Sequence, residues 1–226
     1  MFPHALESDR LDFEGLSRET VDVLALYDVF GRGPDVEAVF EYVDSDPHRT
    51  PKETYEFVRR AETQWDDGEG AKYVIRPKAG EEGTGEIAGV TGIYPDWERR
   101  LATLGIVLDK RFWGRGYSGE RADLFVRLAF ERFDLDLVAV TYIDENERSK
   151  RAIERYVERF GGRYEGLLRN WLAVDGEVFD CHRYSIHRDE YEHARSNASV
   201  DPDRTGQYSS SRMSETVTTS TSVSSM

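Results

Sequence analysis

Apolar positions along the chain change their spacing several times, and each spacing predicts a different element. Alternation of polar and apolar residues predicts a strand over 10–14, and helical spacing predicts a helix over 16–30. A loop-rich region over 31–50 follows, with glycines and prolines and one expected short helix over 36–42. The next amphipathic stripe predicts a helix over 52–65.

The middle of the chain has the pattern of an antiparallel meander. Three strands are expected over 71–76, 86–94 and 101–108, because turn-forming segments separate them at hairpin-like intervals. The spacing then becomes helical over 118–133. A near-continuous apolar run over 135–143 predicts a strand that is buried on both faces.

The last part of the pattern predicts a helix over 147–160, closed by two glycines, and a final pair of strands. These strands are expected over 164–174 and 178–187, joined by a turn at Asp175 and Gly176. Antiparallel strands, one strand–helix–strand–helix unit and a closing hairpin together predict an α+β fold with a mixed sheet.

The length of 226 residues fits one ordinary domain, which we expect over 1–194. From about Arg195 the composition is dominated by Ser, Thr and Asp, so 195–226 is expected to be a disordered tail.

The N-terminus has no basic segment followed by an apolar run, and no apolar run approaches the ~18 residues of a membrane span. Cys181 is the single cysteine, which favours a reducing cytoplasm.

The net charge does not alter the predicted fold, but it limits which molecules the protein can bind. Asp and Glu number 44 against 30 Lys and Arg, a formal charge of −14, which repels nucleic acid and anionic membranes. We interpret the acidity as adaptation to a salt-rich cytoplasm, where screening is strong. The alternative is an acidic surface that recruits basic partners.

One glycine-rich turn carries candidate chemistry. Residues Gly114 to Gly119 match G-x-G-x-x-G between an expected strand and an expected helix. A dinucleotide-binding domain places this turn in its first βα unit, whereas here three strands precede it and a single crossover follows. Glycines, the free N–H groups of a helix start and two arginines, Arg111 and Arg115, nevertheless suit an anion.

The turn and four later motifs resemble the Gcn5-related (GNAT) acetyltransferases. Arg111-x-x-Gly-x-Gly after the strand Leu104–Leu108 looks like the signature of that superfamily. Further segments, in family order, narrow the resemblance to the RimJ/RimL-like branch: Asn146-Glu-Arg-Ser149, 163–169, 175–180 and Tyr184-Ser-Ile186. The resemblance covers residues 10 to about 191.

This resemblance implies a GNAT fold: a mixed sheet of about seven strands that splays between two parallel strands, flanked by about four helices. It implies acetyl-CoA as cosubstrate, lying in the V between 103–108 and 137–142. The residues implied in cofactor binding are Ile106, Val107, Leu108, Arg111, Trp113, Gly114, Arg115, Gly116, Tyr117, Ser118, Asn146 and Ser149. Asn146 would also suit a helix N-cap.

The implied reaction is direct attack of a neutral amine on the thioester, with Ser149 and Tyr156 as candidate catalytic residues and Trp171 as a candidate wall of the acceptor pocket. Cys181 lies in an alternating strand beside no obvious base, so we expect it to be a packed residue. The histidines show no metal-ligand spacing, and no metal is expected.

The sequence departs from the family at the general base. Relatives often carry Glu where Thr103 stands, and some carry a Glu at the position that aligns with Leu172. Glu86, Asp96, His182 and Tyr142 are conceivable substitutes.

Three functions remain open: acetylation of a protein N-terminal α-amine, as ribosomal-protein acetylation in this branch suggests; acetylation of a small amine; and non-catalytic acetyl-CoA binding, which the missing carboxylates keep under consideration. The sequence gives no oligomeric state.

Overall fold

The computed structural model describes residues 1–174 and 176–200. In this part of the chain eight strands form one mixed sheet in the order β1-β2-β3-β4-β5-β6-β8-β7. The strands are β1 (Ala5–Glu7), β2 (Leu11–Gly15), β3 (Ala71–Pro77), β4 (Gly89–Asp96), β5 (Leu101–Leu108), β6 (Leu137–Ile143), β7 (Arg163–Val174) and β8 (Glu177–His187).

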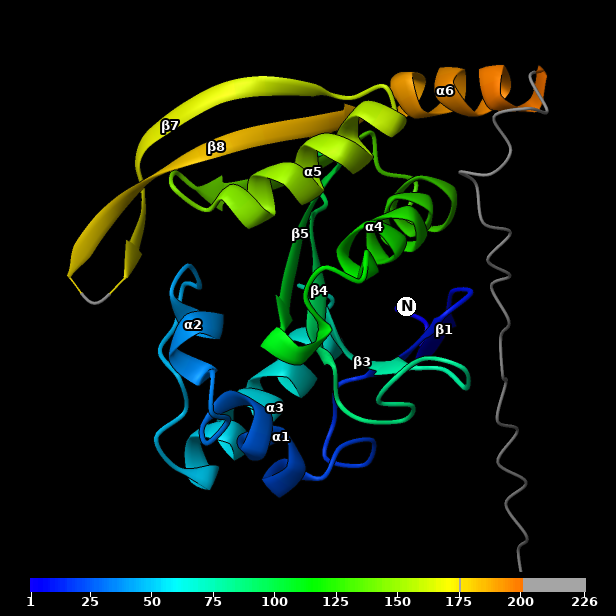
Figure 1. Ribbon diagram of the computed structural model, residues 1–226. Coiled ribbons are helices and arrows are strands. Elements are labelled where there is room, and N and C mark those ends of the chain that lie inside the picture. Colours follow the sequence, from blue (N-terminus) through cyan, green and yellow to red (C-terminus); the bar gives the residue numbers. More distant parts are fainter. Residues whose placement is uncertain (175, 201–226) are drawn as a thin grey trace, which may run out of the picture.

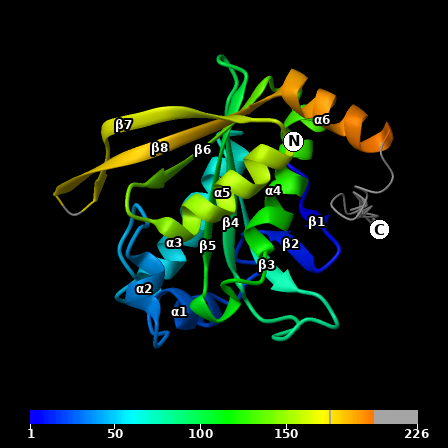
Figure 2. The same ribbon diagram turned by 45° about the horizontal axis from the view of Figure 1, so that its top comes forward.

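Helices lie on both faces of the sheet (Figures 1 and 2). They are α1 (Val23–Phe30), α2 (Val36–Phe40), α3 (Pro51–Asp66), α4 (Tyr117–Arg127), α5 (Glu147–Arg159) and α6 (Arg188–Val200). A 3-10 turn, Lys110–Phe112, precedes α4, and a π-helical turn, Leu128–Arg132, follows it. The expected α+β fold with a splayed mixed sheet is confirmed.

Two hydrophobic cores form because the sheet is covered twice. Side chains of α4 and α5, such as Phe125 and Val157, pack on one face with Ile93 and Leu104 of the strands. The opposite face packs Val74, Val90 and Val107 against α1, α2 and α3. The sheet therefore separates two layers of helices, and an opening in the sheet connects its two faces.

The opening lies where two parallel strands separate. β5 pairs with β6 at only three positions, from Leu101 opposite Leu137 to Thr103 opposite Ala139. Beyond Thr103, β5 continues along β4 as far as Leu108, while β6 continues along β8 as far as Ile143. The backbone edges of both strands are thus left without a strand partner on the side where they face each other, as the resemblance to the family implies.

The last hairpin, β7 and β8, extends well beyond the rest of the sheet in Figure 1. Its register shifts between Leu168 and Leu172, where Asn170 has φ 51° and its N–H donates to Asp180 Oδ1 at 2.8 Å. Such a bulge re-aims the neighbouring side chains. Trp171 next to it is 55% exposed.

The structure differs from the expected elements at three points. The first helix begins at Val23 and not at residue 16, because the Asp22 carboxylate accepts from the Leu24 N–H and caps it there. The short strand β1 and the helix α6 carry no pattern strong enough to have predicted them. α6 continues past Arg195, the expected start of the tail, to Val200. Asp175 of the expected turn and residues 201–226 of the expected tail lie outside the described residues.

Candidate active site

A cleft of about 1430 Å³ passes through the opening between β5 and β6. One end is lined by the turn before α4 and by one face of α5, and the other end by β3, β4, β7 and the segment between α2 and α3. The cleft therefore offers a site for one elongated ligand and a second site across the sheet, which suits a reaction between two substrates.

The glycine turn, Gly114 to Gly119, lines the first end of the cleft. Gly114 and Gly116 have φ of 76° and 80°, conformations that favour glycine, and Gly116 is the N-cap of α4. In the part of the chain that the structure describes, no hydrogen-bond acceptor is recorded for the N–H groups of residues 114–118, whereas the Trp113 N–H donates to Lys110 O. A run of free N–H groups at a helix start is an anion site.

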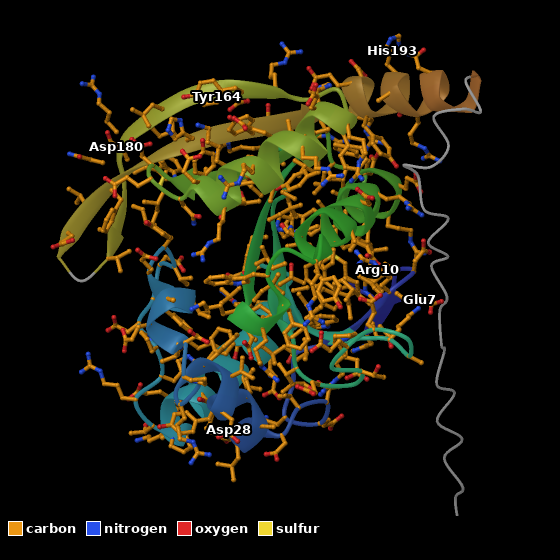
Figure 3. All side chains as sticks on the ribbon, viewed as in Figure 1. Glu7, Arg10, Asp28, Tyr164, Asp180 and His193 are labelled. Atoms are coloured by element: carbon orange, nitrogen blue, oxygen red, sulfur yellow. The ribbon has the colours of Figure 1, made fainter. Side chains whose placement is uncertain are left out.

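The turn is held in place from the N-terminal strands. Arg10, labelled in Figure 3, donates from Nη1 to the Arg115 carbonyl at 3.0 Å and from Nε to Glu120 Oε2 at 2.7 Å. Glu120 also accepts from the Ser8 hydroxyl at 2.6 Å. The loop is therefore pre-shaped, because its conformation is fixed by contacts with a distant segment.

The two arginines of the turn do not supply free positive charge. Arg115 lines the cleft but pairs with Glu82 at 3.0 Å. Arg111 pairs with Asp109 and Glu86, contacts that raise the pKa of its guanidinium, and it is not among the residues that line the cleft. The expected role of Arg111 therefore gains no support from its position.

Trp113 connects the turn to β5 and α5. Its Nε1–H donates to the Leu108 carbonyl at 2.9 Å, and the guanidinium of Arg148 lies 3.5 Å from its ring centroid. Ile106, Val107 and Leu108 line the cleft on the unpaired side of β5. The implied cofactor-binding strand and turn are thus brought to one surface.

Asn146 and Ser149 lie at the start of α5 and also line the cleft. Asn146 caps the helix, because its Oδ1 accepts from the Ser149 N–H at 3.1 Å. This leaves the side-chain Nδ2 of Asn146 and the hydroxyl of Ser149 as the groups that a ligand could meet.

Tyr156, the other candidate catalytic residue, is in the hydrophobic core beside α4. It is 2% exposed, and burial raises the pKa of its hydroxyl to about 12. The charge of Arg121, which is also 2% exposed, acts on the Tyr156 hydroxyl and opposes the effect of burial on its pKa. Both side chains line the cleft, but Tyr156 has the surroundings of a packed residue rather than those of a proton donor.

Both positions of the missing carboxylates face the cleft at its second end. Thr103 is exposed there on β5, and Leu172 and Trp171 reach it from β7. Across from Thr103, the ring of Tyr94 lies against Gly92 and close to Gly105. Burial raises the pKa of Tyr94 to about 12.

Three of the four conceivable bases do not line the cleft. Glu86 pairs with Arg111, and Asp96 pairs with Arg99. His182 forms hydrogen bonds with the Tyr164 hydroxyl through Nδ1 and with Asp144 Oδ1 through Nε2. Only Tyr142 lines the cleft, and burial raises the pKa of its hydroxyl. Cys181 lines the cleft wall as a buried, unpaired thiol whose pKa is raised, mainly by burial.

Several cleft residues were missed by the sequence analysis. His48, Lys72 and Tyr94 come together at the second end from a loop and two strands that are far apart in sequence, so no local signal marks them. Arg148, Arg151 and Arg155 carry a signal that could have been read, because their spacing places them on one face of a helix.

No three His, Cys, Asp or Glu side chains within residues 1–174 and 176–200 are placed to hold a metal ion. Over the same residues, no helix is both long and apolar enough to cross a membrane.

A splayed pair of parallel strands with a glycine turn at the mouth of the cleft is the arrangement that the resemblance to the acetyltransferases implies. A model of the family described as an acetyltransferase (GNAT) domain matches residues 10–156, and the chain therefore belongs to the GNAT acetyltransferase family. It is an acetyl-CoA-dependent N-acyltransferase.

Relatives agree with this membership. "Uncharacterized N-acetyltransferase p20" of Bacillus licheniformis is 23% identical over 187 residues, which are 82% of this chain and 97% of that protein. "Putative ribosomal N-acetyltransferase YdaF" of Bacillus subtilis (strain 168) is 32% identical over 109 residues, 48% of this chain and 57% of that protein. The second likeness agrees with the RimJ/RimL-like branch.

Solved structures share the fold. A GCN5-related N-acetyltransferase from Brucella melitensis superposes with a TM-score of 0.72 at 21% identity, covering 90% of this chain and 88% of that one. The microcin C7 self immunity acetyltransferase MccE, solved in complex with acetyl-CoA and AMP, has a TM-score of 0.67 at 16% identity, over 79% of this chain and 93% of that one.

Proposed function

We propose that this chain transfers the acetyl group of acetyl-CoA to the α-amine of a protein N-terminus. The observation that carries the proposal is the chemistry of the second end of the cleft, where Thr103 and Leu172 stand at two positions for which the resemblance to the family implies a carboxylate in some members. An acceptor that is already partly neutral needs little help from a base. At pH 7 roughly a tenth of an α-amine is neutral, against well under a thousandth of a lysine side chain.

The first end of the cleft fits the cofactor on three counts. Free N–H groups of residues 114–118 suit a pyrophosphate, and the unpaired edge of β5 suits the pantetheine arm as an added strand. The Asn146 amide and the Ser149 hydroxyl lie at the start of α5 along the same cleft. Acetyl-CoA supplies the activated thioester, while these residues hold it and exclude water.

The second end of the cleft suits a polypeptide end because it is open. Trp171, which is 55% exposed, and Leu172 form one wall, and Tyr42 and Asp44 from the segment after α2 form the other. The likeness to a relative named as a ribosomal N-acetyltransferase also supports a protein acceptor. The unpaired Cys181 supports a cytoplasmic location, where thiols stay reduced.

Thiol release from acetyl-CoA with a matched panel of acceptors tests the proposal. The panel holds one peptide with a free α-amine and no lysine, the same peptide blocked at the N-terminus with one lysine added, and several small amines. We expect the first peptide to react at least about a hundredfold faster than the second at pH 7. If a small amine reacts fastest, the acceptor is a small amine and not a protein N-terminus. If acetyl-CoA binds but no acceptor reacts, the chain is a non-catalytic acetyl-CoA-binding module.

A further inference from the structure

The second end of the cleft continues into a smaller pocket of about 820 Å³. The residues that line both cavities come from α3, β3, β4 and the segment between α2 and α3: Asp44, Ser45, His48, Phe57, Lys72 and Tyr94. An acceptor whose amine reaches β5 would extend toward this pocket, so the chemistry of its lining selects among acceptors.

Lys72 lies where the two cavities meet, and its ammonium group has only neutral partners. Its Nζ donates to Gln64 Oε1 at 2.6 Å and lies 5.0 and 5.8 Å from the ring centroids of Tyr94 and Phe57. Among the residues that the structure describes, no ion pair is recorded for Lys72. An ammonium group has three N–H donors, so donors remain for a ligand after the bond to Gln64.

Most carboxylates around the pocket have partners other than Lys72. Asp46 pairs with Arg49 at 3.5 Å, and Glu56 pairs with Arg59 at 3.2 Å. Glu53 accepts from the Arg49 N–H at 2.7 Å. The other carboxylates of the large cleft lie at its first end, on α4 and before β2: Asp9, Glu120 and Asp123.

Asp44 is the remaining carboxylate, and three cations surround the same pocket. Burial and then the charge of Arg60 lower the pKa of Lys72, whereas Asp44 raises it and is the smallest of the three causes. Arg60 and Lys52 also line the pocket, and no ion pair is recorded for either in the described part of the chain. In a chain with a formal charge of −14, this pocket is therefore a place that favours an added negative charge.

Two glycines lie between Lys72 and β5. Lys72 is opposite Gly92 on β4, and Gly92 is opposite Gly105 on β5, so all three lie on one face of the sheet. The Tyr94 ring covers Gly92, because a Cβ there would lie 2.6 Å from Tyr94 Cζ. Among the described residues no hydrogen bond is recorded for the Tyr94 hydroxyl, and burial raises its pKa to about 12, so it is a neutral donor beside Lys72.

We propose that Lys72 and Tyr94 bind a carboxylate that the acceptor carries close to its reactive amine. Two strand spacings, about 10 Å, separate Lys72 from β5, which is the length of about three extended residues. For a polypeptide acceptor, the carboxylate therefore belongs to Asp or Glu at the first or second position. This inference rests on the proposed transfer to a protein N-terminus and names the class of N-terminus.

The test compares lysine-free peptides that differ only in Asp against Asn at the first or second position, with the full chain and saturating acetyl-CoA. We expect the wild type to prefer an Asp peptide at least about tenfold in kcat/KM, because only the carboxylate forms charge-assisted hydrogen bonds with Lys72. The difference should lie in KM, with kcat within about twofold, since the carboxylate binds away from the reacting atoms.

Substitutions at the two donors test each contact. Lys72→Met keeps the apolar stem and removes the charge, so the ratio of Asp to Asn rates should fall to about one. Lys72→Glu should reverse the preference, since two carboxylates repel. Tyr94→Phe keeps the ring under Lys72 and removes one neutral donor, so the ratio should fall about threefold.

Lys78→Met is the matched control. Lys78 follows β3, pairs with Glu7 and Asp12 and lines neither cavity, so the same substitution should keep the wild-type ratio. Each ratio compares two peptides on one protein preparation, and a partial loss of folded protein therefore cancels. A purely structural role of Lys72 would lower both rates and leave their ratio unchanged.

Failure of the carboxylate site and failure of the proposed function give different results. Equal rates for Asp and Asn peptides in the wild type would overturn the site and leave transfer to a protein N-terminus standing, as would a preference that survives in Lys72→Met. If free aspartate or glutamate reacts faster than every peptide, the site is supported and the protein acceptor is overturned. If no peptide and no amino acid reacts, both are overturned.

Discussion

The guanidinium of Arg148 lies 3.5 Å from the ring centroid of Trp113, and this contact joins the first turn of α5 to the glycine turn before α4. Trp113 also donates from Nε1 to the Leu108 carbonyl at 2.9 Å. One indole thus contacts or adjoins the end of β5, the turn and the start of α5, which are the three segments that surround the proposed cofactor end of the cleft. Its loss should change cofactor affinity more than any later step.

Trp113→Ala is expected to raise the KM for acetyl-CoA about tenfold with kcat within about twofold, because a cation–π contact and one hydrogen bond are removed. Trp113→Phe keeps a ring under Arg148 but loses the N–H donor, so we expect a smaller rise of about threefold. Initial rates over a range of acetyl-CoA concentrations measure both. A fall in kcat at constant KM would contradict this role.

Gly114→Ala tests the turn itself. Gly114 has φ 76°, and a Cβ there would meet no atom within 4 Å, so the substitution strains the backbone by ~1 kcal/mol without a clash. We expect a modest loss of stability together with a severalfold rise in the KM for acetyl-CoA, since the neighbouring N–H groups are re-aimed.

Gly85→Ala is the matched control for that variant. Gly85 also has φ 76° and an open surrounding, but it does not line the cleft. It should lose similar stability, measured by thermal unfolding, and keep the wild-type KM. Equal KM changes in the two variants would mean that strain alone, and not the turn, accounts for the effect.

More of the fold than of the candidate site could be predicted from the sequence. Local patterns predict β5, α4 and β6, because strand and helix periods are properties of neighbouring residues, and their order predicts a mixed sheet. The splay of that sheet came from the resemblance to the family. Ion pairing is not local. Arg111 belongs to the motif, yet it pairs with Glu86, which is 25 residues away in the sequence, and it does not line the cleft. Arg121, in contrast, has no marked pattern and becomes notable only through its burial.

The proposed acceptor end of the cleft was the least predictable part of the site. Lys72 of β3 donates to Gln64 Oε1 at 2.6 Å and lies 5.0 Å from the centroid of the Tyr94 ring, so its position depends on a helix and two strands. Burial, followed by the nearby charge of Arg60, lowers the pKa of Lys72. These contacts join residues that are far apart in the sequence, so no local sequence motif could have predicted them.

Thr103→Glu tests whether the missing carboxylate limits the reaction. Thr103 is exposed at the second end of the cleft, so a longer side chain has room there. We expect the carboxylate to act as a base and to raise kcat/KM at pH 6.5 several-fold, most of all for a lysine acceptor. Thr103→Gln, of the same size and without charge, should leave the pH profile unchanged. Equal losses in both variants would show that the position only tolerates a small side chain.

His48 should make stability depend on pH. Burial among aromatic rings is the main cause that lowers the pKa of His48, and its Nδ1 lies 2.9 Å from the Thr54 hydroxyl. The folded state therefore takes up its proton at lower pH than the unfolded state. Since the unfolded state binds more protons below about pH 6.5, the stabilisation is complete above that pH and decreases as the pH falls through it.

The measurement for His48 is the free energy of unfolding between pH 7.5 and about pH 5, in the wild type and in His48→Gln. We expect the wild type to lose more stability over this range than the variant, whatever their difference at pH 7.5. Parallel curves would exclude His48 as the source of the pH dependence.

Cys181 offers the last test, because it is the single cysteine of the chain and lines the cleft wall. A thiol whose pKa is raised by burial is a poor nucleophile, so the acetyl group should pass directly to the amine and not through this sulfur. Cys181→Ala is expected to keep kcat within about twofold and to cost about 1 kcal/mol of stability through the small cavity it leaves. Mass spectrometry of the wild type, quenched after mixing with acetyl-CoA alone, should show unmodified Cys181. An acetylated Cys181 that forms and decays at the rate of turnover would contradict direct transfer.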